Sequence, residues 1–166
     1  MVGIFSYPIV GKLPPPYNCR PMLQGRGVIA RFLVLIGFYG AWPGSWHSFN
    51  VTCLELFPIT LAVHIWGRLM TNQCFVFFTD NAALVDILHK QSSKHTIVMT
   101  FLRPLILCCL RHNIFFNARH VPGLQNSRAD FISRFRIDSF KAITPDADPF
   151  PTPVPTNLLP ENWSLI

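Results

Sequence analysis

A run of apolar residues at positions 74–79 limits what this chain can fold into more than any other feature. The run reads Cys-Phe-Val-Phe-Phe-Thr, contains no charge, and ends at Asp80 and Asn81. An apolar run of this length, rich in aromatic residues, is typical of a strand that is buried on both faces. Such a strand needs other elements above and below it, so we predict a sheet that is covered by helices.

The segments around this strand have the helical patterns that such a cover requires. Thr52 and Glu55 have the spacing of a capping box, which predicts a helix from Thr52 to about Met70, with Pro58 early in it. The other expected elements are helices over 82–89 and 96–111, a strand over 113–119, and a last helix over 127–135 after Pro122-Gly123. This order of elements predicts an α/β fold with a covered sheet.

Length and charge restrict the domain count and the kind of partner. The chain has 166 residues, which is enough for one domain with a real core. Its 14 basic and 8 acidic residues give a net charge of +6, which favours nucleic acid or another polyanion as partner. Residues 144–166 are dominated by Pro and small polar residues, which predicts a tail or linker.

The cysteines predict the cellular compartment of the protein, and the apolar stretches bear on whether it enters a membrane. Five cysteines occur, at 19, 53, 74, 108 and 109, without a Cys-x-x-Cys pair. We interpret all five as reduced, buried thiols of an intracellular protein, cytoplasmic or nuclear, and we expect no zinc because the histidines form no metal pattern with them. The stretch 28–42 carries Arg31 and is shorter than the roughly 20 apolar residues of a spanning helix, so we expect no membrane segment and no signal peptide.

Three of the eight acids occupy positions where metal-binding or catalytic carboxylates are expected. Glu55 lies in the first turn of a predicted helix, Asp80 follows the buried strand, and Asp130 lies in the first turn of the last predicted helix. Active sites of open α/β sheets form at the carboxyl ends of strands, where such carboxylates would hold Mg²⁺. Taken singly, each acid has a structural alternative: a helix cap for Glu55, a turn for Asp80, and a favourable charge at a helix start for Asp130.

A known family has the same segments in the same order. The chain contains LELF at 54–57, FFTDNAALV at 77–85, and the pattern H-x-P-G-x-x-N-x-x-A-D-x-x-S-R from His120 to Arg134. These segments resemble the ribonuclease H domain of retrotransposon reverse transcriptases, and most of all the DIRS-type elements that move with a tyrosine recombinase. The segments at 38–46, 49–67 and 146–155 resemble the same group, so the likeness covers roughly residues 38–160.

The resemblance implies a fold, a reaction and a set of residues. The family fold is a mixed sheet of five strands with flanking helices, and its reaction is Mg²⁺-dependent hydrolysis of the RNA strand in an RNA–DNA hybrid. By motif match, Glu55, Asp80 and Asp130 are the second, third and fourth of four metal-binding catalytic acids. The nucleic-acid-binding residues would be Arg119, His120, Asn126, Arg128 and Arg134. The chain would act as a monomer or as part of a polyprotein.

The first of the four family acids is missing. It belongs on the first strand, well before Glu55, but residues 1–54 contain no Asp or Glu. Codons can be chosen for Arg20 to Gly25 that, when read in another frame, encode Thr-Asp-Ala-Ala-Gly. This motif is like the one that carries the first acid in the family. We therefore interpret 1–37 as an aberrant segment that is translated out of frame, 38–140 as the ribonuclease H-like domain, and 141–166 as a Pro-rich tail.

Three functions compete on this sequence. The first is a ribonuclease H-like remnant with little or no nuclease activity, because three acids hold two Mg²⁺ ions poorly. The second is an active nuclease in which Asn18 or a main-chain carbonyl replaces the missing acid. The third is a non-catalytic nucleic-acid-binding or interaction module, supported by the basic C-terminal half, whose arginines are also explained as ordinary surface charge.

Overall fold

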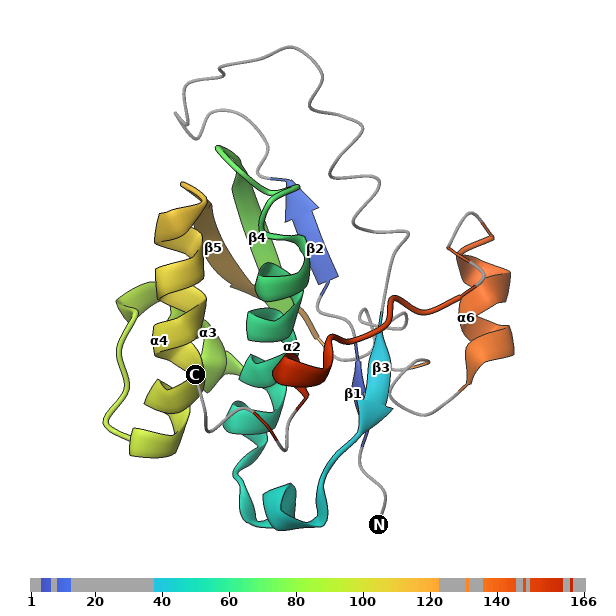
Figure 1. Cartoon of the computed structure of the whole chain (residues 1–166), viewed down its shortest axis with the longest axis horizontal. Helices are drawn as coiled ribbons and strands as arrows, with labels where there is room; N and C mark the ends of the chain where they lie inside the picture. Colours follow the sequence, from blue (N-terminus) through green and yellow to red (C-terminus); the bar gives the residue numbers. More distant parts are fainter. Residues whose placement is uncertain are drawn as a thin grey trace.

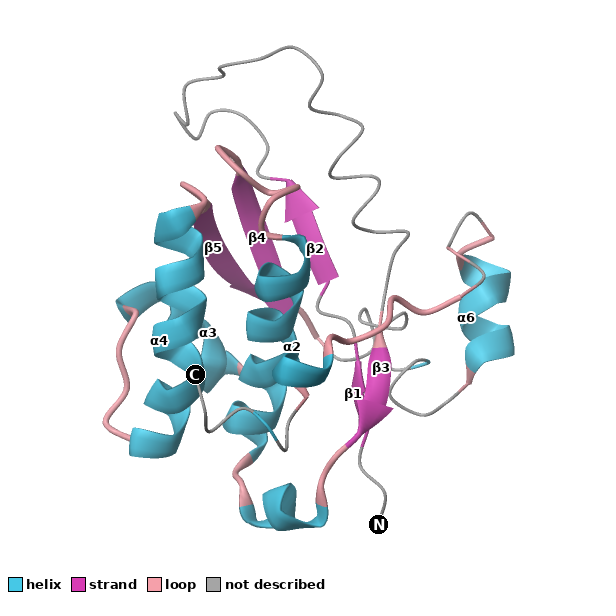
Figure 2. Cartoon of the chain, viewed as in Figure 1, coloured by secondary structure: helices cyan, strands magenta, loops and turns pink. Residues whose placement is uncertain are grey.

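The described part of the chain is a mixed α/β arrangement in which helices pack on one small sheet (Figures 1 and 2). The computed structural model describes residues 4–6, 9–12, 38–122, 131, 136–145, 148, 150–159 and 162. Its strands are β1 (Ile4–Ser6), β2 (Ile9–Lys12), β3 (Tyr39–Ala41), β4 (Cys74–Thr79) and β5 (Phe115–His120). Its helices are α2 (Val51–Trp66), α3 (Ala82–Lys90), α4 (Thr96–Arg111) and α6 (Ile137–Ile143), with 3₁₀ turns η1 (Gly44–Ser48) and η3 (Thr156–Leu158). The prediction of an α/β fold with a covered sheet is confirmed.

β4 is the central strand of the sheet. β2 pairs with it antiparallel and β5 pairs with it parallel, so the strand order is β2-β4-β5. β1 and β3 form a separate antiparallel pair. Phe75, Val76 and Phe77 are each no more than 1% exposed, which confirms the prediction of a strand buried on both faces. Among the described residues the strands therefore form one mixed sheet of three strands and one pair of two, not a single five-stranded sheet.

Helix α2 is capped two residues before the predicted position. The Asn50 side chain accepts a hydrogen bond from the Cys53 backbone nitrogen at 3.0 Å, so Asn50 is the cap and Thr52 lies inside the helix. The capping box of Thr52 and Glu55 was therefore wrong, because an Asn two residues earlier is an equally competent cap. The helix ends at Trp66, and turns occupy the residues up to Asn72. Without a capping role, the Glu55 side chain is available for another partner.

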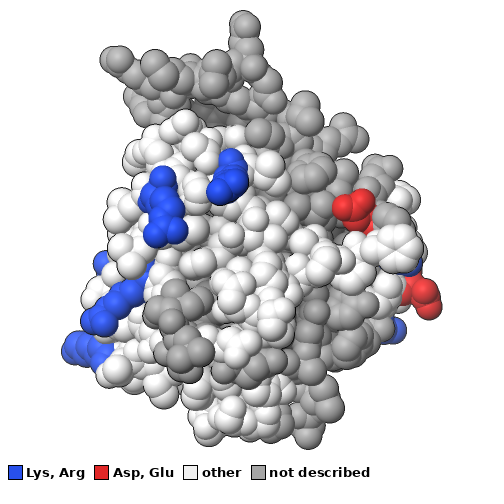
Figure 3. Space-filling view, in the orientation of Figure 1, with Lys and Arg blue, Asp and Glu red and all other residues white. Residues whose placement is uncertain are grey.

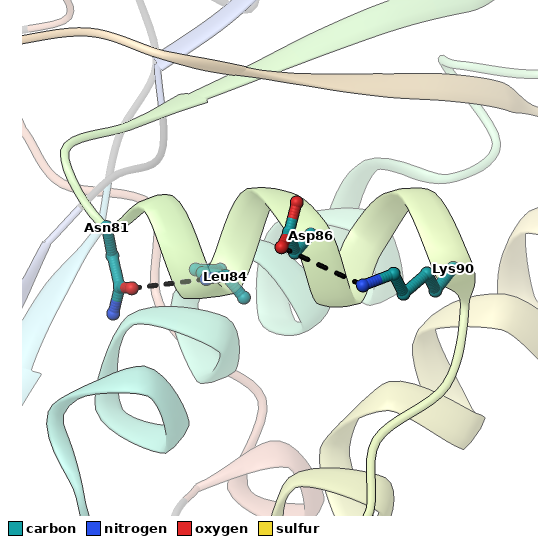
Figure 4. A network of polar contacts seen from close by, with 4 residues as sticks. All are labelled: Asn81, Leu84, Asp86 and Lys90. Atoms are coloured by element: carbon teal, nitrogen blue, oxygen red, sulfur yellow. Dashed lines mark hydrogen bonds and ion pairs between the residues drawn. The ribbon is translucent and has the colours of Figure 1, made fainter.

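Helices α3 and α4 were predicted closely. α3 begins after Asn81, whose side chain accepts a hydrogen bond from the Leu84 backbone nitrogen at 3.1 Å, and an Asp86–Lys90 ion pair lies along its exposed side (Figure 4). α4 has the predicted bounds, with Pro104 inside it. The following strand begins at Phe115 rather than at residue 113, because Asn113 has a φ of 50° and ends the helix in the left-handed region.

One hydrophobic core joins the helices to the sheet. It contains Leu56 and Leu61 of α2, Leu102 and Leu105 of α4, and Phe77 of β4, each fully buried. An aromatic group closes one end of the core, where Trp46 of η1 packs edge-on against Phe57 and close to Phe101. The segment just before α2, which contains η1, lies at the bottom of the view in Figure 1. These contacts fix α2 and α4 side by side over β4, and so position the residues at the end of that strand.

The Pro-rich C-terminal region returns to the body of the protein. Leu158 of η3 is 7% exposed and belongs to the core, and the partly buried Val154 packs against the same core. Figure 1 shows this segment crossing in front of α2. Apolar side chains spaced along an otherwise Pro-rich segment thus anchor part of the predicted tail.

The cysteines only partly match the prediction. Cys53, Cys108 and Cys109 are free and buried, and burial raises the pKa of Cys109 to about 12, so its thiol is unreactive. Cys74 at the start of β4 is disulfide-bonded, so the prediction of five reduced thiols was wrong. Sequence spacing does not reveal which cysteines the fold brings together. No helix in the described part of the chain combines the length and the apolar character needed to cross a membrane.

Candidate functional site

Glu55 and the end of β4 form the candidate site. Glu55 lies one turn into α2, and α2 packs on the sheet through its neighbour Leu56, which is fully buried. Thr79, the last residue of β4, donates its hydroxyl proton to Glu55 Oε2 at 3.0 Å. Asp80 is the next residue and is exposed. Two carboxylates that are 25 positions apart in sequence thus lie at the carboxyl edge of the central strand, where open α/β sheets form their sites.

Asn81 connects three elements at the same edge. Its backbone nitrogen donates to Thr79 Oγ1 at 3.1 Å, and its side-chain Nδ2 donates to Thr52 Oγ1 at 3.2 Å. Its Oδ1 accepts from the Leu84 backbone nitrogen and caps α3 (Figure 4). One side chain therefore holds the start of α2, the end of β4 and the start of α3 together, which fixes the loop that carries Asp80.

The end of β5 supports the same loop. His120 Nε2 lies 3.1 Å from the main-chain oxygen of Asp80, and the Val121 backbone nitrogen donates to the Thr79 oxygen at 2.9 Å. The ring donates the first of these bonds when its Nε2 carries a proton. His120 therefore positions the backbone at Asp80, and its exposed ring lies beside the acid pair.

The surroundings of Glu55 favour its protonated form. Partial burial raises the pKa of the Glu55 carboxyl above its ordinary value of 4.5, and the negative charge of Asp80 raises that pKa further. Hydrogen bonds from Thr79 and Asn81 oppose both effects by stabilising the carboxylate. The two acids are close enough to repel each other, which is the electrostatic arrangement that a bound cation would relieve.

The structure brings together only some of the predicted site residues. Glu55, Asp80 and His120 meet at one edge, and Arg119 is exposed at the adjoining end of β5. The other predicted residues, Asp130, Asn126, Arg128 and Arg134, lie outside the described residues, as does most of the predicted last helix. Within the described ranges, no three His, Cys, Asp or Glu side chains form a group that would hold a metal ion.

Sequence reasoning missed two of the polar residues that build this site. It assigned Thr79 to a strand and Thr52 to a helix cap, but both hydroxyls bond across elements, to Glu55 and Asn81. The only available signal was the position of Thr79, where a polar residue ends an apolar run immediately before Asp80. Asn81 directly follows Asp80, and its bond to Thr79 holds the loop that carries Asp80.

The donor set does not fit a pair of Mg²⁺ ions. Two ions about 3.5–4 Å apart require several oxygen donors arranged around both of them. The described residues supply the carboxylates of Glu55 and Asp80, and one oxygen of Glu55 already accepts the Thr79 hydroxyl proton. Asp130 would make a third acid, and residues 1–54 supply none. No hydrolytic step through a metal pair is therefore assigned to this chain.

Comparisons with known proteins give no neighbour. No family model, no curated protein and no solved structure matches the chain significantly. The α/β class therefore rests on the strand order and the helical cover alone, and any statement about function depends on the site residues.

Proposed function

We propose that this chain is a ribonuclease H-like remnant of a DIRS-type retroelement that has lost its nuclease activity. The observation that carries the proposal is the meeting of Glu55 with Asp80 at the end of β4, in a chain without any acid in residues 1–54. The ribonuclease H family places its second and third acids on the first helix and at a strand end. Glu55 on α2 and Asp80 after β4 occupy positions of that kind.

The loss of activity follows from the electrostatics of the site. Each well-placed charge contributes several kcal/mol at a transition state that develops charge. Without the first acid, the remaining carboxylates bind cations weakly and leave the attacking water without a fixed position. We therefore expect hydrolysis of hybrid RNA to be lower by several orders of magnitude than in a complete site of this family.

A cleavage assay tests this proposal directly. The full chain is incubated with an end-labelled RNA–DNA hybrid and Mg²⁺, beside the variants Asp80→Asn and Lys90→Ala; Lys90 is an exposed residue of α3. We expect all three proteins to give the same background. Cleavage by the unchanged chain and by Lys90→Ala, but not by Asp80→Asn, would show an active site and overturn the proposal.

The charge of the chain supports a second candidate, a non-catalytic nucleic-acid-binding module. The net charge is +6, and Arg119 and His120 are exposed beside the acid pair. Phosphate contacts by such groups make binding fall steeply with salt. The measurement is the affinity for an RNA–DNA hybrid in a salt series, with Arg119→Gln as the variant and Arg68→Gln, another exposed arginine, as the control. Equal loss in both variants would indicate nonspecific charge rather than a binding site.

A further inference from the structure

The outer face of α4 carries a strip of exposed leucine and arginine residues that the candidate site does not use. Leu107 is 63% exposed and Leu110 is 72% exposed, although both lie in a well-packed helix. Arg103 and Arg111 are exposed one turn before and one turn after Leu107. We call these four residues the Arg–Leu strip. Residues three or four apart lie on the same side of a helix, so the strip forms one continuous surface.

The opposite side of α4 already forms the contacts that hold the helix in the fold. Val98, Phe101, Leu102, Leu105, Cys108 and Cys109 are the buried residues of α4. They belong to the core shared with α2 and the sheet, and α4 lies at the outside of the helical layer in Figure 2. The exposed leucines therefore add nothing to the packing of this domain. Large apolar side chains grouped with charged ones on a surface are typical of interaction sites.

The charge on this side of the molecule has one sign. α4 contains no acidic residue, and the only ion pair among the described residues joins Asp86 to Lys90 on α3. In Figure 3, Lys and Arg atoms lie over α4 and over the nearby end of α2, whereas the Asp and Glu atoms lie on the side of α6. Arg103 and Arg111 thus have no acidic partner within the described chain, and a partner that brings carboxylates would complement them.

We propose that the Arg–Leu strip binds an acidic amphipathic helix of a partner protein. Apolar side chains of that helix would cover Leu107 and Leu110, and its carboxylates would pair with Arg103 and Arg111 on either side. This is the recognition of a helix by its apolar row, with flanking charges that fix its register. The proposal is independent of the ribonuclease H-like assignment, because it uses none of the residues near Glu55 and Asp80.

Two other occupants fit the strip less well. A second copy of this chain, packed by a two-fold axis through Leu107, would place Arg103 of each chain opposite Arg111 of the other, and like charges would meet. Nucleic acid would satisfy the arginines, but its hydrated phosphates give the two leucines no apolar surface to contact. The combination of leucine and unpaired arginine therefore favours an acidic and apolar protein segment.

Binding of two designed peptides tests the proposal on the full chain. The first is a fluorescent helical peptide with leucines at i, i+4 and i+7 and glutamates beside them, and the second has lysines in place of the glutamates. Fluorescence anisotropy at low salt is expected to show binding of the glutamate peptide only, weakened by added salt. The double variant Leu107→Ser/Leu110→Ser should bind about tenfold more weakly or worse. The control Lys94→Glu, at an exposed position before α4, should bind as the unchanged chain does.

A charge swap separates docking from damage to the fold. The double variant Arg103→Glu/Arg111→Glu should lose the glutamate peptide and gain the lysine peptide, which an unfolded variant would not do. The proposal is overturned by any of three results: neither peptide binds, binding is unchanged in both double variants, or the unchanged chain is a dimer that the leucine variant dissociates. Loss of hybrid binding in the leucine variant, without any peptide binding, would also overturn it and indicate a nucleic-acid surface.

Discussion

Thr79 at the end of β4 donates its hydroxyl proton to Glu55 Oε2 on α2 at 3.0 Å. The same hydroxyl oxygen accepts the backbone N–H of Asn81 at 3.1 Å. One side chain, 6% exposed, therefore joins the central strand to a helix and to the loop that carries Asp80. This contact places the two described acids of the candidate site next to each other, whatever chemistry the site retains.

Replacing Thr79 by Val should destabilise the protein by about 1–3 kcal/mol. Valine keeps the shape but leaves the Glu55 carboxylate and the Asn81 N–H without their partner in a half-buried place. Urea denaturation at neutral pH measures the loss. Thr79→Ser should recover most of it, because serine keeps the hydroxyl. As a control, Thr100→Val changes an exposed hydroxyl that bonds only to the Thr96 carbonyl, and should cost little. Equal losses at positions 79 and 100 would contradict the role given to Thr79.

Stability should depend on pH through Glu55. Burial and the charge of Asp80 raise the pKa of the Glu55 carboxyl above 4.5, so folding favours the protonated acid. The resulting stabilisation is present below pH 4.5 and is lost as the pH rises through the higher folded pKa. Glu55→Gln does not titrate, so its stability relative to the unchanged chain should improve as the pH rises across that window. Denaturation midpoints of both proteins between about pH 4 and pH 7 measure this. A difference that does not vary with pH, or that varies in the opposite direction, would refute the raised pKa.

Gly67 should tolerate no side chain, although its φ of −54° is ordinary. A Cβ at this position would lie 2.5 Å from the Val63 carbonyl oxygen and 2.9 Å from His112 Cδ2, where α2 ends against the end of α4. Gly67→Ala should therefore destabilise the fold by about 1–3 kcal/mol through overpacking. Gly44→Ala is the matched control, because a Cβ there meets no atom within 4 Å. Urea denaturation measures both variants. Equal free energies of unfolding would show that the end of α2 shifts to accommodate the added methyl group at little cost.

The sequence was most informative where hydrophobic pattern alone decides the structure. β4, α3 and α4 were found within a residue or two, because their burial follows from runs and periods that no competing signal disturbs. The meeting of Glu55 with Asp80 was also predictable, because helices and strand ends of an α/β sheet converge at one edge.

The helix cap of α2, the start of β5 and the disulfide at Cys74 were not predicted correctly, because local sequence signals do not decide them. Asn50 and Thr52 are both competent helix caps, and only the packed fold decides that Asn50 caps α2 while Thr52 bonds to Asn81. Asn113 delays β5 because its backbone takes the left-handed conformation, which a pattern of apolar residues does not reveal. The disulfide at Cys74 depends on distances between elements, which spacing along the chain does not give.

Among the described residues β5 pairs only with β4, and two side chains block its outer edge. In a parallel pair alternate residues bond to the neighbouring strand. Phe115 donates to the oxygen of Gln73, just before β4, and Val121 donates to the oxygen of Thr79 at its end. The backbone of Ala118, which is out of phase with these two residues, therefore faces outward. Asn117 Oδ1 accepts the Ala118 N–H at 2.7 Å, and the Ala118 oxygen lies 2.9 Å from Nε2 of His89 on α3.

Unpaired backbone at an edge strand promotes pairing with other chains, so the double variant His89→Ala/Asn117→Ala should associate at concentrations where the unchanged chain does not. Sedimentation velocity over a concentration series measures this association. Lys90→Ala, which removes only the exposed Asp86–Lys90 ion pair beside His89, is the control and should sediment as the unchanged chain does. A double variant that keeps the unchanged sedimentation coefficient throughout would mean that α3 covers the edge without help from His89 and Asn117. In that case the bonds to Ala118 stabilise the strand locally, and their loss would appear as a lower denaturation midpoint instead.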